Sequence, residues 1–487
     1  MIQRQTIKKR ERWLRFGKIL LAFIVFHLWQ VDSYAIEVVT GKDTTVLPLE
    51  KFIVLACEHD TVFQEILIDE LYLTYYKDLT LPARDIILSV KGQYDFVFHP
   101  VDGHEKSGIV SLGKLFPYTG TTVSADYTAS SSINDQERKS SFTFSVSQPI
   151  ARNAFGRANR MLKKIRGLEI DLAKHQIVEA YEDYLYAVIA LYFKWYSAYE
   201  NMKTAESSYN FNERLLKNIR KKMTYDVARR VDVNKIHLQV MEKEENLIAL
   251  KNNYDQALNY VFQATLYEKA ETLIPEFPSF QQKTKDSFDE EYSMFKASSR
   301  TYQMLTLLEK KGILEIEKTA DDLLPSANLE MGYIEEGSGY DIQNKENRAF
   351  AGFAFEFPFP GQKEKARNEY AKIDLEKIKL TSSNKKVQLK TDLKNLHMQI
   401  ERQNGLVDIA QKKIRVSEAI VKDETKNYSH GRIALNDLIQ AINTLEENKF
   451  KLVYHKITLN NLILEWLRLT DKLIERKNID TLSGDKK

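Results

Sequence analysis

The chain has 487 residues, of which 43% are hydrophobic, 29% are charged and only 18 are glycine. Such a composition supports packed structure and is typical of long, solvated helices. The formal net charge of +3 is nearly balanced, so the chain lacks the basic footprint of a nucleic-acid-binding protein, and we expect no nucleic-acid partner. Cys57 is the only cysteine, which excludes an internal disulfide.

Residues 1–35 have the organisation of a secretory signal peptide. Basic side chains up to Lys18 precede an apolar run from Ile19 to Trp29, and Ser33-Tyr34-Ala35 supplies small residues for cleavage. The apolar run is too short to cross roughly 30 Å of hydrocarbon as a helix. We therefore expect an exported protein rather than one with an N-terminal anchor.

The rest of the chain repeats one plan twice. The first repeat is predicted over residues 36–275 and the second over 276–475, followed by a short polar tail at 476–487. Each repeat is expected to contain a short helix, strands, a very long helix and a returning helix. The expected bounds are short helices at 48–78 and 288–322, strands within about 86–148 and 327–357, long helices at about 158–223 and 363–426, and returning helices at about 227–264 and 434–474.

Four prolines mark the switches between helix and strand. Proline fixes φ and pushes the preceding residue towards extended geometry, so each is expected to end a regular element. They are Pro82, Pro149, Pro325 and Pro358.

The predicted strands alternate between aromatic and small or charged residues. Phe142, Phe144 and Val146 alternate with serine and threonine, and Phe353 and Phe355 alternate with small residues. Alternation alone also fits a half-buried soluble sheet. The aromatic face suits lipid outside a barrel and the small polar face suits water inside it. The inter-strand segment is longer in the first repeat, which predicts a surface loop or an added hairpin there.

Each long helix runs for more than 60 residues without a proline. At about 1.5 Å per residue it extends roughly 90 Å. A globular domain does not require such a length, whereas a conduit across the periplasm does.

Taken together, these segments resemble the TolC-like outer-membrane efflux family over nearly the whole mature chain. Leu81-Pro82 and Leu324-Pro325 are similar to the family's helix-to-strand breaks, and Gln148-Pro149-Ile150 to its strand-to-helix signature. The most specific match is Tyr428-Ser429-His430-Gly431, followed by Asn436-Asp437-Leu438. It is similar to the family's Tyr-x-x-Gly turn and to the acidic position beyond that turn.

The resemblance implies a mixed α/β membrane protein that assembles as a homotrimer. Each protomer would contribute a β-hairpin from each repeat, or four strands, to a twelve-stranded β-barrel, and the long helices would form a periplasmic α-helical barrel. Four strands cannot close alone, because single-chain bacterial barrels begin at about eight.

The implied function is that of an outer-membrane channel in a tripartite efflux or type I secretion system. The channel would lie in the outer membrane of a Gram-negative-type bacterium, contact outer-membrane lipid and extend into the periplasm. It would conduct cargo passively after docking with a periplasmic adaptor and an inner-membrane transporter.

The resemblance also places candidate residues at the periplasmic entrance. Asp437 stands at the family's first acidic position and Gln440 at its second, so a single ring of Asp437 is expected. Arg432 precedes the family's tip arginine position by one residue, and Gly431 ends the turn motif. The alternative for Asp437 is that it only caps or solvates the returning helix.

In the first repeat, Asp232 aligns with Asp437, and Asp226 then occupies the glycine position of the turn. The resemblance implies a closed state held by links between the two turns. The available links are Tyr428 to Asp232, and Arg432 to Asp226 or Asp232. The alternative for Tyr428 is packing against the neighbouring helix.

Catalytic and cofactor motifs are lacking in the sequence. It has no His-Glu-x-x-His motif and no Gly-rich phosphate loop, so we expect no enzyme and no cofactor. His99, His104 and Glu105 could reach one metal ion, but in a loop that contains Gly and Asp we expect them to be solvated residues. The remaining alternatives are a periplasmic coiled-coil adaptor or structural rod without a barrel and, third, an enzyme on a helical scaffold.

Overall fold

A computed structural model describes residues 44–98, 103–131, 138–225, 228–266, 272–277, 287–339 and 346–474. The predicted signal peptide and C-terminal tail lie outside these residues. The chain divides into two compact units. One comprises Met1–Ile68, Ile177–Arg300 and Val387–Lys487, and the other comprises Asp69–Gln176 and Thr301–Lys386.

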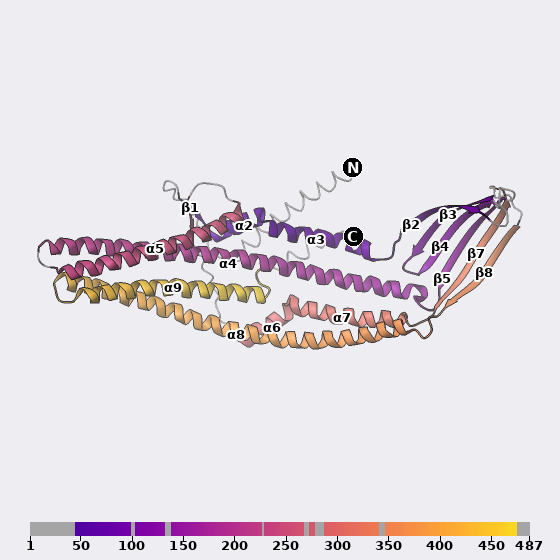
Figure 1. Ribbon diagram of the computed structural model, residues 1–487. Helices are drawn as coiled ribbons and strands as arrows, with labels where there is room; N and C mark the ends of the chain where they lie inside the picture. Colours follow the sequence, from indigo (N-terminus) through magenta and orange to yellow (C-terminus); the bar gives the residue numbers. More distant parts are fainter. Residues whose placement is uncertain are drawn as a thin grey trace. The chain divides into compact units, whose positions relative to one another are not determined.

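Four helices dominate the fold, namely α4 (Arg157–Met223), α5 (Arg230–Thr265), α8 (Gln362–Ser429) and α9 (Leu435–Leu469) (Figure 1). With 67 and 68 residues, α4 and α8 each extend about 100 Å at the α-helical rise. They lie where the sequence predicted the long helices, and α5 and α9 lie where it predicted the returning helices. In the described part of the chain, no helix is both long and apolar enough to cross a membrane.

The two short helices of the prediction are each divided in two, so that part of the prediction was wrong. The first consists of α2 (Leu49–His59) and α3 (Thr61–Thr80), and the second of α6 (Phe288–Ser298) and α7 (Arg300–Asp321). Asp60 and Ser299 separate the halves in extended geometry, with ψ of 126° and 127°. Asp60 Oδ1 accepts a hydrogen bond from Val62 N–H at 3.0 Å, so it caps a new helix instead of continuing the old one.

An aromatic core holds the first unit together. Phe52 on α2 and Tyr192, Phe193 and Trp195 on α4 are fully buried. The Tyr192 hydroxyl donates to the Leu47 carbonyl at 2.8 Å, which ties α4 to strand β1. Strand β1 (Thr44–Leu47) pairs in parallel with β6 (Thr272–Pro275), a two-stranded element that the sequence analysis did not predict.

The second unit contains one antiparallel sheet of six strands, in the order β2-β3-β4-β5-β7-β8. The strands are β2 (Ile86–Val97), β3 (Gly103–Phe116), β4 (Thr121–Ser131), β5 (Arg138–Pro149), β7 (Ser326–Ser338) and β8 (Glu346–Glu356). The sheet therefore has one hairpin more than the four strands expected of each protomer in the barrel, which agrees with the added hairpin that is one of the two predictions for the first repeat. The extra hairpin, β2–β3, occupies the longer inter-strand segment of the first repeat.

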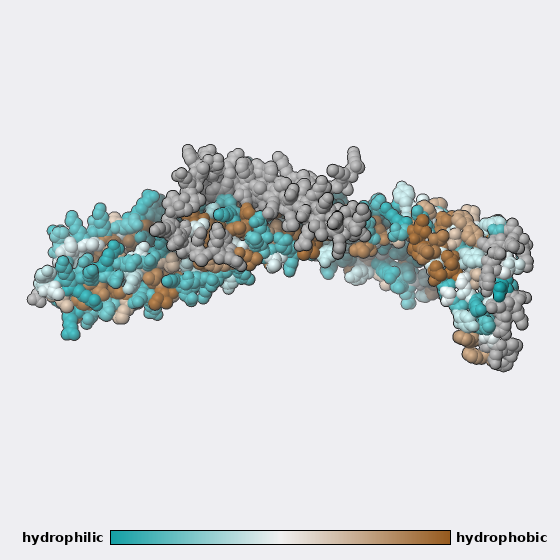
Figure 2. All heavy atoms as spheres, turned by 90° about the horizontal axis from the view of Figure 1, so that it is seen from above, coloured by the Kyte–Doolittle hydropathy of each residue, from teal (hydrophilic) through white to brown (hydrophobic). Residues whose placement is uncertain are grey.

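The two faces of this sheet differ as the sequence predicted. Phe144 pairs with Ala125 and Tyr333, and Ser145 pairs with Ser124 and Gly332, so the two kinds of side chain lie on opposite faces. The exposed members of the apolar face include Leu88, Val90, Phe96, Val110, Leu112, Phe144, Met331, Tyr333, Phe353 and Phe355. Figure 2 shows apolar side chains gathered over the strands.

The four prolines lie at the ends of regular elements. Pro82 follows the end of α3 by two residues, and Pro325 directly precedes β7. Pro149 is the last residue of β5, and Pro358 follows the end of β8 by two residues. Each position agrees with the restriction that proline imposes on its predecessor.

Candidate functional site

Most of the predicted entrance residues lie in the turn between α8 and α9 or within two helical turns of it. Gly431 has a φ of +71°, a left-handed conformation that glycine adopts without steric cost. The Arg432 N–H donates to the Asn427 carbonyl at 3.0 Å, and the Gly431 N–H donates to the Tyr428 carbonyl at 3.1 Å. The first of these bonds is the six-to-one closure of a Schellman motif. The Tyr-x-x-Gly sequence therefore ends α8 sharply and starts α9 four residues later.

The turn between α4 and α5 lies beside it. Helix α4 ends at Met223, the Thr224 N–H donates to the Arg220 carbonyl at 3.2 Å, and α5 begins at Arg230. Asp226, one of the predicted site residues, lies outside the described residues. Asp232 lies in the first turn of α5 and is half-buried.

An apolar cluster holds the two turns together. Its buried members come from α4, α5 and α9, and Val421 and Tyr428 of α8 pack against it. They are Leu215, Leu216, Ile219, Ile236, Val240, Leu435, Leu438 and Ile442. Because both turns share this cluster, the predicted residues of the two repeats are brought to the same end of the helical unit.

Tyr428 lies at the junction between the turns. Its ring centroid is 4.8 Å from Lys222 Nζ at the end of α4, a cation–π distance. Burial, followed by the charge of Asp232, raises the pKa of the Tyr428 hydroxyl. Among the described residues no hydrogen bond joins Tyr428 to Asp232. Within one chain, Tyr428 therefore packs against the apolar cluster, and the predicted hydrogen bond to Asp232 is not formed.

The acidic and basic candidates remain exposed. Asp437, Gln440 and Arg432 all face solvent in the single chain. The Asp437 carboxylate accepts from the Ala434 N–H, so it closes the first turn of α9. Within the described part of the chain, Arg432 forms no ion pair with Asp232.

Polar contacts between α5 and α9 continue from the turns, and the sequence analysis missed them. Lys235 Nζ donates to Asn436 Oδ1 at 3.3 Å, and Gln239 Nε2 donates to Asn443 Oδ1 at 2.9 Å. Their common spacing of four residues on α5 was a usable signal, because it places side chains on one face. The sequence could not predict which residues of α9 they pair with, because the pairing depends on how two helices far apart in the sequence pack together.

The next contact along this face is a buried ion pair. Lys243 pairs with Glu446, whose Oε2 also accepts from the Ser208 hydroxyl at 3.0 Å. The Glu446 side chain is 7% exposed, and its Oε1 has no partner in the described structure. A buried pair of this kind fixes the register of the two helices, because a shifted arrangement leaves a buried charge unpaired.

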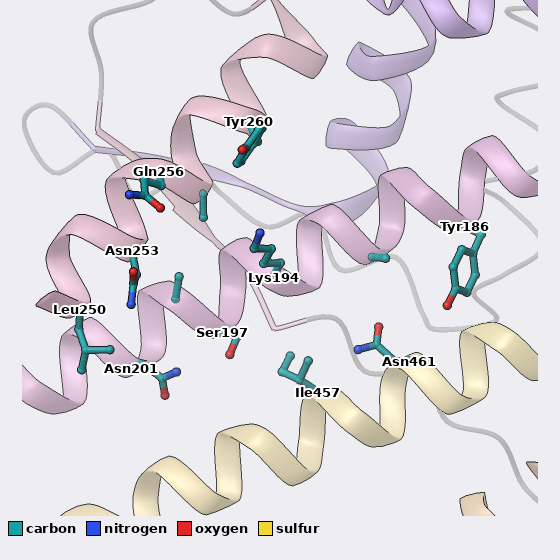
Figure 3. A pocket seen from close by; sticks show the side chains of 13 residues that line it. Tyr186, Lys194, Ser197, Asn201, Leu250, Asn253, Gln256, Tyr260, Ile457 and Asn461 are labelled. Carbon is teal, nitrogen blue, oxygen red and sulfur yellow. The ribbon is translucent and has the colours of Figure 1, made fainter.

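A surface groove of about 740 Å³ runs along α4, α5 and α9 (Figure 3). Lys194 Nζ lies 5.5 Å from the ring centroid of Tyr260 on its wall. The other polar lining is mainly amide and hydroxyl groups, including Ser197, Asn201, Asn253, Gln256 and Asn461. Such a lining offers hydrogen bonds but no converging acid and base.

No group of three or more His, Cys, Asp or Glu residues that could hold a metal occurs in the described residues. The interpretation of His104 and Glu105 as loop residues was wrong, because both lie in β3. His104 stacks on Tyr94 of β2 with ring centroids 5.6 Å apart. His99 lies outside the described residues.

No family model and no curated protein sequence matches the chain. Solved structures match its fold over almost its whole length. The outer membrane protein VceC from Vibrio cholerae matches with a TM-score of 0.67 and 12% identity, over 87% of this chain and 95% of that one. The CmeC outer membrane channel of Campylobacter jejuni matches with a TM-score of 0.67 and 14% identity, over 90% of each chain. The open state of the MtrE outer membrane channel of Neisseria gonorrhoeae matches with a TM-score of 0.63 and 14% identity, over 92% of this chain and 98% of that one.

Proposed function

We propose that this chain, which has the fold of the TolC-like outer-membrane channels, is the outer-membrane channel of a tripartite efflux or type I secretion system. As a homotrimer it crosses the outer membrane through its strands and the periplasm through its helices. A periplasmic adaptor and an inner-membrane transporter dock at the paired turns and supply the energy. The channel itself is passive and is not an enzyme.

The observation that carries this proposal is the six-stranded sheet with one apolar face and two open edges. Phe353 and Phe355 are 59% and 60% exposed on that face in the single chain. Exposed apolar surface of this extent marks a site of lipid or protein contact. Strands β2 and β8 end the sheet without a partner among the described strands. Unpaired edges do not occur in hydrocarbon, so several copies must pool their strands.

The rival function, a periplasmic adaptor or rod, is less well supported. A rod explains the 67- and 68-residue helices of this chain. It gives no reason for strands of 11 to 14 residues that expose one apolar face. Those lengths reach or exceed the roughly 9–11 residues that a tilted strand needs to cross a bilayer.

Fractionation and assembly test the proposal directly. The full chain, expressed with its own first 35 residues, is expected in the outer-membrane fraction as a trimer whose gel migration changes on heating. Analytical ultracentrifugation in detergent measures the assembly, and planar bilayers measure the conductance. A monodisperse monomer without conductance would refute the channel and favour the rod.

A further inference from the structure

The hairpin β2–β3 is bonded to the rest of the sheet along its whole length. Strand β3 pairs with β4 from Lys106↔Ser131 to Phe116↔Thr121, without interruption. That ladder occupies the side of β4 that a four-stranded protomer would leave free. Closing a barrel through β4 would require this entire ladder to break.

The apolar face continues without a change of side from the hairpin through the other four strands. One row across the sheet consists of Leu88, Leu112, Ala125, Phe144, Tyr333 and Ala349. Every member of this row is apolar or aromatic. Lys106 and Lys114 of β3 also lie on this face, six residues before and two residues after Leu112. A hairpin in water outside the bilayer has no need of such an apolar row in line with its neighbours, whereas one in lipid does.

The hairpin also has the size of a membrane-spanning element. Strands β2 and β3 contain 12 and 14 residues, and β4 and β5 contain 11 and 12. Val90 and Phe96 on β2 are 71% and 68% exposed, comparable with the aromatic residues of β8. The hairpin therefore matches the remaining strands in length and in exposed apolar character.

The two outer strands have the directions needed to join. All five pairings within the sheet are antiparallel, so β2 and β8, at opposite edges of six strands, run in opposite directions. The β8 edge of one copy can therefore extend an antiparallel ladder on the β2 edge of the next.

We infer that β2–β3 is part of the membrane wall and that three copies close an eighteen-stranded barrel through β8–β2 contacts between copies. This inference rests on the proposed function. It replaces the twelve strands that the resemblance implies. Because barrel diameter grows about linearly with strand number, the wall is about 1.5 times as wide as a twelve-stranded one.

Cysteine pairs on the apolar face distinguish an eighteen-stranded barrel, closed through β8–β2 contacts, from a twelve-stranded barrel closed through β8–β4 contacts. In a Cys57→Ala background, Val90→Cys or Leu88→Cys on β2 is combined with Ala351→Cys or Ala349→Cys on β8. A short thiol cross-linker is expected to give covalent dimers and trimers in outer membranes. Within one chain these pairs are five strands apart, or about 24 Å, and cannot be joined by it.

The matched control places the cysteine on β4 instead of β2. Ala125→Cys with Ala351→Cys is expected to give monomers only, and Ala125→Cys with Leu112→Cys to give a link within one chain, identified by mass spectrometry. Covalent trimers from the β4–β8 pair, without the β3–β4 link, would overturn the inference and establish a twelve-stranded closure.

Arginine substitutions test whether the hairpin contacts lipid. Val90→Arg is expected to lower the yield of heat-modifiable trimer several-fold, as a lipid-facing charge does, whereas Ser89→Arg on the opposite face leaves the yield unchanged. If the wild type forms a normal trimer and the two variants give equal trimer yields, the inference is overturned while the proposed channel remains intact. A wild-type chain that forms no trimer at all would overturn both.

Discussion

The Asp437 carboxylate accepts a hydrogen bond from the backbone N–H of Ala434, with an oxygen–nitrogen distance of 3.3 Å. Asp232 has the same relationship to Arg229 in the first repeat, also at 3.3 Å. Alanine has no side-chain oxygen to accept in return, so only one half of a capping box forms at α9. Both aspartates therefore stabilise the start of a returning helix, and the capping role considered for Asp437 is present in the structure.

Asp437→Asn separates the capping role from an entrance filter. The amide oxygen keeps an acceptor for Ala434, while the charge is removed. If three copies form a negative ring, the variant is expected to show lower cation preference and weaker block by multivalent cations. Loss of the charge at the helix start costs about 0.3–1 kcal/mol. Reversal potentials in planar bilayers measure the filter, and unchanged selectivity would leave capping as the only role.

The gate prediction concerns Tyr428 and Arg432. Tyr428 packs on the apolar cluster beside Lys222, and within the described chain it makes no hydrogen bond to Asp232. A lock that uses its hydroxyl must therefore form between copies or in the assembled state. Tyr428→Phe combined with Arg432→Ser keeps the ring and is expected to raise single-channel conductance and the open fraction.

This experiment has two controls, the yield of trimer and a substitution at a second tyrosine. Tyr225, in the other turn, is 70% exposed, so Tyr225→Phe is expected to leave conductance unchanged. Conductance of the double variant at the wild-type closed value, with a normal trimer yield, would show that packing is the only role of Tyr428.

The barrel face is tested by neighbouring residues of β5. Phe144→Arg places a charge on the apolar face and is expected to cost roughly 2–4 kcal/mol near the bilayer midplane. Ser145→Arg replaces a hydroxyl that lies 2.8 Å from Ser124 Oγ on the opposite face, where water can solvate the charge. Urea titration of protein refolded into vesicles measures both free energies. Equal costs, or the reverse order, would show that the inside and outside faces are assigned wrongly.

Much of the fold was predictable from local sequence. Long runs without proline predicted α4 and α8, and alternation predicted β4, β5, β7 and β8. The hairpin β2–β3 was harder to identify, because Lys106 and Lys114 of β3 share its apolar face and interrupt the pattern. Only pairing with β4 reveals that the alternation continues through these positions.

The entrance was predictable in part. Tyr428, Gly431 and Asp437 come from one continuous motif, so the sequence located them together. The contact between Gln239 and Asn443 joins residues 204 positions apart. Nothing in either local sequence specifies that pairing, because it depends on the relative rotation of α5 and α9.

A buried ion pair supplies a stability prediction in the helical unit. Arg300 pairs with Glu182 and, at 2.9 Å, with Asp471, and its side chain is 4% exposed. Arg300→Met leaves two carboxylates without their cation and is expected to cost about 3–5 kcal/mol. The double variant Arg300→Met/Glu182→Gln is expected to recover part of the loss.

The loss of stability in Arg300→Met should depend on pH. Burial raises the pKa of Glu182 to about 7, even though the charge and hydrogen bond of Arg300 lower that pKa. Without the arginine, the folded state binds this proton more tightly than the unfolded state does. Stability of Arg300→Met therefore falls as pH rises above the unfolded pKa of about 4.5. Thermal unfolding is expected to show a larger deficit at pH 8 than at pH 5.5, and an equal deficit at both would contradict this account.

The last prediction concerns Glu169 on α4, whose carboxylate has three partners. It binds Lys311 Nζ at 2.8 Å, Arg166 Nη1 at 2.6 Å and the Tyr76 hydroxyl at 3.0 Å. Burial by itself raises the pKa of Glu169, but the bonds to Lys311, Arg166 and Tyr76 outweigh burial, and the pKa is lowered. Glu169 therefore stabilises the fold above its unfolded pKa, and this contribution is lost as pH falls through the folded pKa.

Glu169→Gln removes the titration and keeps the side-chain shape. At pH 7 the variant is expected to be less stable by about 1.5–3 kcal/mol, the strength of a hydrogen bond to a charged group. As pH falls below about 4.5, the wild type loses this advantage and the two unfolding curves converge. Glu317→Gln, at an exposed position of α7, is the matched control and should follow the wild type throughout. Thermal midpoints of detergent-purified protein between pH 3 and pH 7 measure the effect, and a constant gap between wild type and Glu169→Gln would show that Glu169 contributes nothing through its charge.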